Sequence, residues 1–105
     1  MRHEIVLAPS ALRELQSLPA HDRAEVRDAM ERHLRQQPRR VSKSRIKELR
    51  GLVRPQYRLR VGDLRVFYDV SGRTVEVLAV IAKAQAERWL EEKGRRREAG
   101  STGES

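Results

Sequence analysis

The sequence predicts a small single α+β domain of the order β-α-α-β-β-β-α, in which a helical hairpin packs on a largely antiparallel four-stranded sheet. Three observations predict it. Two amphipathic segments bounded by prolines stand near the N-terminus, the apolar period changes from about 3.6 to 2 near residue 56, and a last amphipathic segment follows the alternating runs. This domain is expected to span residues 1–93. Residues 94–105 (GRRREAGSTGES) are typical of a disordered basic and polar tail.

The N-terminal half predicts one strand and two helices. Residues 3–8 (HEIVLA) are a short β-type run that ends at Pro9. The first helix is expected to be capped by Ser10 and to end before Pro19, and the second covers residues 22–37. The apolar stripes expected on them are Leu12, Leu15 and Leu18, followed by Val26, Met30, His33 and Leu34. These stripes should face the sheet.

The stretch PQYRLRVGDLRVFYDV, residues 55–70, is typical of two strands around a tight turn. Gly62-Asp63 suits a two-residue type II′ turn, because glycine occupies its first central position. This register places Arg60 opposite Arg65. One face of the hairpin is apolar and should form the core: Tyr57, Leu59, Val61, Leu64, Val66 and Tyr68.

A second turn at Ser71-Gly72 should lead into a third strand of the meander, RTVEVLAVIA. Counting from that turn places Val75, Val77, Ala79 and Ile81 on the core face. Residues 83–94 (KAQAERWLEEKG) then predict a terminal helix. Its apolar side carries Ala86, Trp89 and Leu90.

The opposite face of the hairpin gathers charge, and its expected members are Arg58, Arg60, Arg65, Phe67, Glu76 and Leu78. Like charges that face each other across a strand pair are destabilising, so Arg60 opposite Arg65 favours an anion bound between them. Arginine offers a planar fork to phosphate, and an exposed Phe67 would stack on a base. The alternative is a solvated face on which Arg65 pairs with Glu76 or Asp69.

The charge balance favours an anionic partner. The 105 residues include 23 Lys and Arg against 15 Asp and Glu, a formal net charge of +8. Seven of the basic residues fall in residues 39–54, a long connection of the kind that is often functional, with Glu48 as its one acidic residue. RNA contacts are predicted there at Lys43, Arg45, Lys47 and Arg50. An ordinary solvated loop is the alternative.

Two absences in the sequence bear on the compartment. It has no cysteine, which excludes disulfides and thiolate metal sites. It has no apolar run of signal-peptide or transmembrane length. A cytoplasmic protein without membrane contact is therefore expected.

The hairpin motif YRLRVGDLRVFYDV is preceded by KELRGL (47–52) and followed by VEVLAVIAKAQAERWL. Together these segments resemble the RelE/ParE superfamily of type II toxin–antitoxin toxins, over about residues 2–92. The RelE branch is favoured. Its members enter the ribosomal A site and cut mRNA, where the 2′-OH attacks the adjacent phosphate and leaves a 2′,3′-cyclic phosphate and a 5′-OH. The resemblance thus implies an mRNA endoribonuclease (mRNA interferase) that inhibits translation, with no cofactor and no metal ion.

The resemblance also implies roles for individual residues. The residues carried over are Arg58, Arg60, Arg65, Lys83 and Trp89. The expected catalytic set is Arg60, Arg65, Lys83 and Glu48, and the expected RNA-binding set is Arg58, Phe67, Trp89 and the four basic loop residues. Arg60 and Arg65 would stabilise the charge of the transition state, and Lys83 would donate a proton or clamp the phosphate. Arginine is a poor general base, so Glu48 is the candidate for that role. Trp89 stands where the family has a C-terminal aromatic, and its alternative role is to dock the last helix.

Two other readings stay open. ParE-branch toxins share the fold, lack the nuclease residues and inhibit DNA gyrase by binding it. A basic adaptor whose one partner is an acidic antitoxin is the third reading. All three imply a cognate antitoxin with a segment that is disordered when free and wraps the toxin when bound. The first adds the ribosome and mRNA as partners, and the second adds gyrase.

Overall fold

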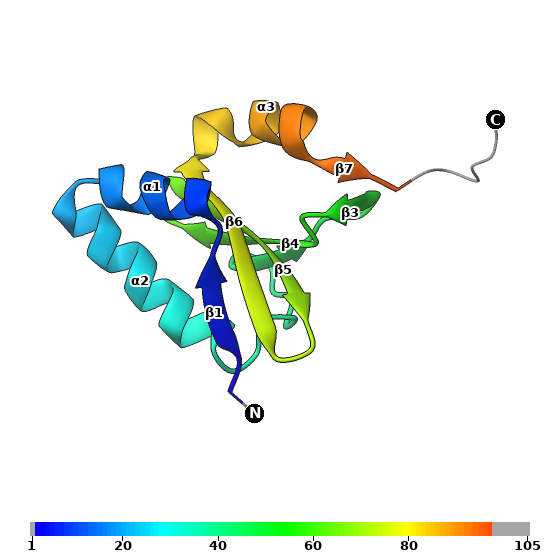
Figure 1. Ribbon diagram of the computed structural model, residues 1–105, viewed down its shortest axis with the longest axis horizontal. Helices are drawn as coiled ribbons and strands as arrows, with labels where there is room; N and C mark the ends of the chain where they lie inside the picture. Colours follow the sequence, from blue (N-terminus) through cyan, green and yellow to red (C-terminus); the bar gives the residue numbers. More distant parts are fainter. Residues whose placement is uncertain (1, 98–105) are drawn as a thin grey trace.

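The computed structural model describes residues 2–97, and Figure 1 shows a helical hairpin on one side of a twisted sheet. Its elements are β1 (Glu4–Leu7), α1 (Pro9–Ser17), α2 (Ala20–Leu34), β2 (Ile46–Glu48), β3 (Leu52–Arg54), β4 (Tyr57–Val61), β5 (Leu64–Ser71), β6 (Thr74–Ala82), α3 (Lys83–Lys93) and β7 (Arg95–Arg96). The main sheet has the order β1-β6-β5-β4-β2, and β3 pairs with β7 in a separate ribbon. The predicted α+β class and element order are confirmed.

The sheet has five strands rather than the four expected, because part of the basic loop is extended. Residues 46–48 form β2, which pairs antiparallel with β4. β1 pairs in parallel with β6, and the other pairings in this sheet are antiparallel. α3 ends at Lys93, and Arg95–Arg96 form β7 beside β3, so this part of the expected disordered tail is a strand instead. The rest of the expected tail, residues 98–105, lies outside the described residues.

The first helix begins two residues earlier than predicted, with Ala8 instead of Ser10 at the cap position. Pro9 occupies its first turn, where a fixed φ and a missing N–H are tolerated. Ser10 is therefore inside the helix and is no cap; its hydroxyl donates to the Leu78 carbonyl at 3.4 Å. The expected stripe is also shifted, since Leu12 is 42% exposed and Ala11 is buried in its place. In α2, Val26, Met30 and Leu34 are buried as predicted, together with Ala29.

The register of the first hairpin agrees with the prediction. Leu59 lies opposite Val66, and Arg60 lies opposite Arg65. Gly62 has φ +56°, a conformation that the turn requires and that side chains disfavour. The second turn is one residue later than expected: Ser71 pairs with Thr74, so its central residues are Gly72 and Arg73.

A bulge in β6 makes part of the predicted core face wrong. Phe67 pairs with Ala79 and Tyr68 pairs with Val77, so Leu78 is an extra residue on β6. Beyond it the alternation is reversed: Val80 joins the core under α1 and α2, while Ala79 and Ile81 turn to the opposite face. This core contains side chains from both helices and from β2, β4, β5 and β6. Within residues 2–97, no helix is long and apolar enough to cross a membrane.

Candidate phosphate-binding face

Three arginines converge on the sheet face opposite α1 and α2. Arg58 and Arg60 are two residues apart on β4, so their side chains point to the same face. Arg65 on β5 lies directly opposite Arg60. Lys47 joins them, because β2 places it opposite Arg58. We call the surface formed by Arg58, Arg60 and Arg65 the arginine face.

Arg65 is held rigidly and is largely removed from water. It is 7% exposed, and its Nη1 donates to the carbonyl oxygens of Gly62 and Leu64, both at 2.9 Å. Burial lowers the pKa of Arg65, the charge of Arg60 lowers it further, and Asp63 in the turn opposes both. The guanidinium is thus fixed in orientation beside a second positive charge.

Arg58 has an unsatisfied donor. Its Nε is buried and has no hydrogen-bond partner among the described residues. Burial lowers the pKa of Arg58, and the charges of Arg65 and Arg60 lower it further. A buried donor without a partner costs about 1–3 kcal/mol, and more where the group is charged. An anion bound beside these arginines would offset the mutual repulsion of the guanidiniums.

The carboxylates that could have neutralised Arg65 are already paired elsewhere. Arg54 contacts Asp69 at 3.2 Å and Glu76 at 3.3 Å. Asp69 also accepts a hydrogen bond from the Gln56 N–H at 2.7 Å. Within residues 2–97, no ion pair involves any residue of the arginine face. The predicted alternative, in which Arg65 pairs with Glu76 or Asp69, is therefore wrong.

Phe67 is not the exposed aromatic that the sequence predicted. It is fully buried, because the Trp89 ring of α3 stacks on it with centroids 5.0 Å apart and an angle of 12° between the planes. Trp89 itself is half-buried. Its contact with Phe67 docks α3 on this side of the sheet, which is the alternative role that the sequence left open for Trp89. Phe67 offers no free ring to a base in this arrangement.

Lys83 lies next to the turn of the arginine hairpin. It is the first residue of α3, and its backbone N–H donates to the Asp63 carbonyl at 2.7 Å. Its side chain is exposed. The structure therefore brings Lys83 to the end of the hairpin that carries Arg60 and Arg65.

Glu48 is separated from the arginine face by the strand register. β2 places it opposite Tyr57, whose ring belongs to the other face of the sheet. It lines a hollow of about 650 Å³ together with Tyr57, Arg39 and Arg50. It also lines a hollow between β2 and α3, together with Lys47 and Glu87. By the strand register, its side chain leaves β2 on the face away from Arg58 and Arg60.

The remaining basic loop residues are distributed around β2. Arg50 lines the hollow beside Glu48, and Lys43 is exposed in the turn before β2. Arg45 adjoins the arginine hairpin, because its carbonyl accepts the Arg60 N–H at 2.8 Å. Arg54, which the sequence pattern did not single out, occupies the two carboxylates. The sequence did indicate this pair, because Arg54 is a basic residue directly before a hairpin whose second strand carries Asp69.

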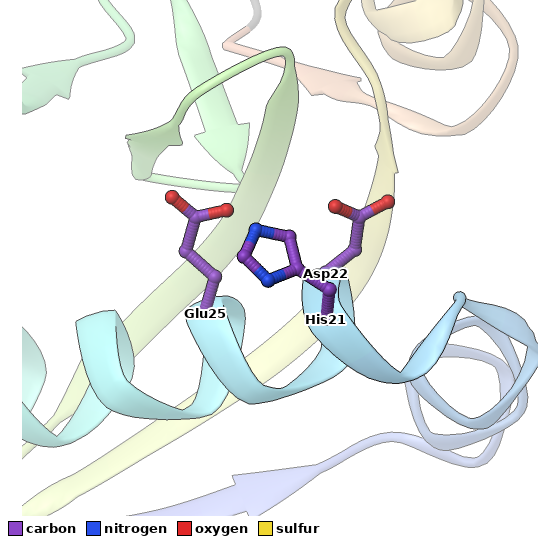
Figure 2. Close-up of side chains that lie close together, drawn as sticks. All are labelled: His21, Asp22 and Glu25. Carbon is purple, nitrogen blue, oxygen red and sulfur yellow. The ribbon is translucent and has the colours of Figure 1, made fainter.

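One further cluster could hold a cation. His21, Asp22 and Glu25 in the first turns of α2 have ligand atoms within 4.8 Å of one another, and Figure 2 shows the imidazole between the two carboxyl groups. His21 and Glu25 are exposed. Acidic residues are also favourable at a helix N-terminus without any ion. The cluster lies on α2, which packs on the sheet face opposite the arginines.

Comparison with known proteins agrees with this geometry. The family model for the ParE toxin of the type II toxin–antitoxin system parDE matches residues 5–87. Among curated proteins, none matches the chain. A chain of the RelBE2 toxin–antitoxin complex from Mycobacterium tuberculosis is 26% identical with a TM-score of 0.67, over 78% of this chain and 99% of that one. A chain of the archaeal RelE–RelB complex from Pyrococcus horikoshii is 26% identical with a TM-score of 0.60, over 81% and 99%.

A mutant of Escherichia coli toxin RelE in the free state is 22% identical with a TM-score of 0.67, over 87% of this chain and 94% of that one. At this identity the likeness concerns the fold. The family match, by contrast, extends over β1 to the middle of α3 and includes the arginine hairpin. The chain therefore belongs to the ParE toxin family of type II toxin–antitoxin systems, within the RelE/ParE superfamily.

Proposed function

We propose that this toxin is a ribosome-dependent mRNA endoribonuclease that inhibits translation. The observation that carries the proposal is the arginine face: three guanidiniums without an ion-pair partner among the described residues, one of them with a buried, unsatisfied Nε. A phosphodiester that lay between Arg60 and Arg65 would turn their repulsion into a shared attraction. Lys47 and Lys83 extend the positive surface on either side.

The proposed reaction is attack of the 2′-OH on the adjacent phosphate. A bond forms between the 2′ oxygen and phosphorus while the bond to the 5′ oxygen breaks, which leaves a 2′,3′-cyclic phosphate and a 5′-OH. Negative charge grows on the phosphate oxygens during this step. Arg60 and Arg65 would stabilise it, because Arg65 is fixed before the substrate arrives and Arg60 lies directly opposite it, and Arg58 would hold the backbone phosphate. Lys83 would donate the proton that the leaving 5′ oxygen needs.

Water would accept the 2′ proton, because the arginines stay protonated and Lys83 acts as the proton donor. Glu48, the carboxylate nominated from the sequence, points to the other side of the sheet. We therefore assign the rate acceleration chiefly to charge stabilisation, which is often the largest single contribution in enzymes. Glu48 and the hollow that it lines would then contribute to substrate contact rather than to proton transfer.

We also propose a cognate antitoxin as partner. The similar structures from Mycobacterium tuberculosis and Pyrococcus horikoshii are toxin–antitoxin complexes. A net charge of +8 suits an acidic antitoxin segment that folds on binding.

The proposal is tested with purified full-length protein and ribosomes that carry a defined mRNA. We expect cleavage within the A-site codon and 5′-OH ends, detected by primer extension. Arg65→Ala should lower the cleavage rate about a hundredfold to a thousandfold, the usual effect of removing one charge-stabilising donor. Arg73→Ala, in the exposed turn between β5 and β6, is the matched control and should cleave normally. Intact mRNA in cells whose growth the protein arrests would contradict the nuclease proposal.

Gyrase inhibition is the second candidate function, and the match to the ParE toxin model favours it. This activity needs binding and no cleavage. A supercoiling assay with purified gyrase distinguishes the two: inhibition by both the wild type and Arg65→Ala, with intact mRNA on ribosomes, would establish the ParE-like activity in place of the nuclease.

A further inference from the structure

A second basic hollow lies on the helix side of the molecule, where α2 ends and the basic loop returns to the sheet. Its volume is about 390 Å³. The charged and titratable side chains that line it are Arg32, His33, Arg40 and Arg45, and the rest of the lining is Gln36, Gln37, Ser42, Ser44 and Ile46. Among residues 2–97, no acidic side chain lines it. We call it the α2–loop hollow.

The turn that presents Arg45 to the hollow is well ordered by its own hydrogen bonds. The Ser42 hydroxyl accepts the N–H groups of Arg45 at 3.0 Å and Ile46 at 3.2 Å. The Ser42 N–H donates to the Ile46 carbonyl at 2.9 Å. Ile46 is buried in the core, which anchors the end of the turn. Arg45 thus projects from a fixed backbone rather than from a loose loop.

The cations of the hollow are only partly compensated. Arg32 pairs with Asp28 at 2.9 Å, and Arg40 donates to the neutral Gln37 side chain at 2.8 Å. Among the described residues, the Arg45 side chain has no ion pair and no hydrogen bond. The hollow therefore has a net positive charge.

His33 reports the same positive potential. Burial lowers its pKa, the charges of Arg45 and Arg32 lower it further, and Asp28 opposes them. Asp28 does not line the hollow and is already paired with Arg32. Because His33 is next to Arg45, which has no ion pair among the described residues, an anion bound here would be stabilised.

A backbone hydrogen bond connects the α2–loop hollow to β4, the strand that carries two residues of the arginine face. The carbonyl of Arg45 accepts the N–H of Arg60, and the next residue, Ile46, lies opposite Leu59 on β4. Neighbouring strands are about 4.8 Å apart. Arg45 therefore lies at the free edge of the sheet. It is next to β4, the strand that carries Arg58 and Arg60.

We propose that the α2–loop hollow binds a phosphate group of the RNA backbone, a few nucleotides from the phosphodiester at the arginine face. The RNA would cross the edge of β2, with Arg45 and Arg40 on one phosphate and the arginine face on another. The identification of the ligand as RNA rests on the proposed function. The affinity of the hollow for phosphate does not.

The first experiment measures the pKa of His33 by NMR of its ring protons in the full-length protein, with and without inorganic phosphate. Bound phosphate should raise the pKa of His33, because it opposes the charges of Arg45 and Arg32. Arg45→Gln should raise this pKa in the free protein and reduce its response to phosphate. His21, at the other end of α2, is the internal control and should not respond. A His33 pKa unchanged by phosphate, or equal responses at His33 and His21, would overturn the proposal.

The second experiment measures binding of a short oligonucleotide with a 2′-deoxy substitution at the scissile position, as a function of salt. For a single strand, each phosphate that the protein no longer neutralises reduces the slope of log K against log salt by about 0.7. Arg40→Gln with Arg45→Gln should reduce the slope by about 0.7, whereas Arg13→Gln with Arg27→Gln on α1 and α2 should leave it unchanged. An unchanged slope in the first pair, with the slope reduced by Arg65→Ala, would overturn the hollow while the proposed function stands.

Ribosomal cleavage by the wild type separates the two proposals further. Loss of oligonucleotide binding in every arm, together with intact mRNA, would contradict the proposed function, while a His33 response to phosphate would still support the anion site. A His33 response to a poly-glutamate peptide and to neither phosphate nor oligonucleotide would assign the hollow to an acidic protein segment and overturn the RNA proposal.

Discussion

At the scale of single residues, the arginines of the hairpin region are of two kinds: those with a carboxylate partner and those without one. Arg54 is paired with two carboxylates and ties the β3 segment to β5 and β6. The three arginines of the arginine face have no such partner within residues 2–97, although Arg65 is nearly as buried as a core residue. Structural charges are normally neutralised when they are buried. Uncompensated ones in a fixed geometry indicate a ligand.

The position of Glu48 gives a prediction about the reaction. Glu48 lies opposite Tyr57, on the face away from the arginines. Glu48→Gln should therefore leave the rate of ribosomal mRNA cleavage within about threefold of the wild type. Removal of a general base would lower this rate by about a hundredfold or more. Single-turnover cleavage on programmed ribosomes measures it. Arg60→Gln serves as the matched variant on the arginine face and should slow the reaction strongly. A loss in Glu48→Gln as large as that in Arg60→Gln would return Glu48 to the catalytic set.

Asp69 gives a prediction about pH. Burial raises its pKa, and the N–H of Gln56 and the charge of Arg54 only partly oppose this. The folded state therefore binds the proton of Asp69 more tightly than the unfolded chain, in which the pKa of Asp is about 3.9. The stability contributed by this group is present below that value and is lost as the pH rises through the raised pKa.

The free energy of unfolding of the wild type, relative to Asp69→Asn, should therefore fall as the pH increases from about 4. Urea denaturation at a series of pH values measures this difference. Asp28→Asn, an exposed aspartate on α2, is the matched control. A difference between wild type and Asp69→Asn that is constant, or that grows with pH, would show that the pKa is not raised.

At the scale of elements, the two hairpins differ in how well the sequence predicts them. The β4–β5 register follows from the sequence because charged and apolar residues alternate on both sides of Gly62-Asp63. In β6, residues 77–81 (VLAVI) are all apolar, so they hold no information about which side chain faces which side. At the bulge, the Leu78 carbonyl accepts a hydrogen bond from Ser10 of α1, a contact between distant residues that no local pattern shows.

The candidate site, too, could be predicted from the sequence only where local alternation determines the geometry. The arginine face was predictable because its members lie on two strands joined by a short turn. The burial of Phe67 was not, since the ring that covers it, Trp89, comes from a helix far along the chain. Residues 39–54 were expected to be a loop, so the pairing of β2 with β4, which sets the face of Glu48, was not anticipated.

Glu14 holds the bulged part of β6 and gives a prediction about stability. Past Leu7 the edge of β6 has no strand partner, and the Glu14 carboxylate of α1 accepts the N–H of Val80 at 2.8 Å. Val80 is 2% exposed, so this N–H would be left buried and unsatisfied in Glu14→Ala. We expect a loss of about 1–3 kcal/mol in the free energy of unfolding, measured by chemical denaturation. Glu14→Gln keeps an acceptor oxygen and should lose less. Equal losses in the two variants would mean that packing, and not this hydrogen bond, is responsible.

At the scale of the whole molecule, the net charge belongs to one segment. Residues 39–65 contain ten basic and two acidic residues, a net charge of +8 that equals the charge of the entire chain. The remaining residues carry thirteen of each sign and balance. This segment forms β2, β3, β4, the start of β5 and the loops between them, and it supplies both the arginine face and Arg45. The excess positive charge therefore lies on β2, β3, β4, the start of β5 and their loops, and this part of the molecule would attract an anionic partner.

This asymmetry predicts which charges govern RNA binding. Changing Lys43, Arg45, Lys47 and Arg50 to Gln should reduce the slope of log K against log salt by up to about 3 for a single-stranded RNA, at about 0.7 for each phosphate that is no longer neutralised. Changing Arg13, Arg27, Arg73 and Lys93 to Gln removes the same total charge from exposed positions outside the segment and should leave the slope nearly unchanged. Fluorescence anisotropy between about 50 and about 300 mM salt measures both variants. Equal reductions would show that net charge alone attracts RNA, whereas a reduction confined to the first variant places the RNA on the basic segment.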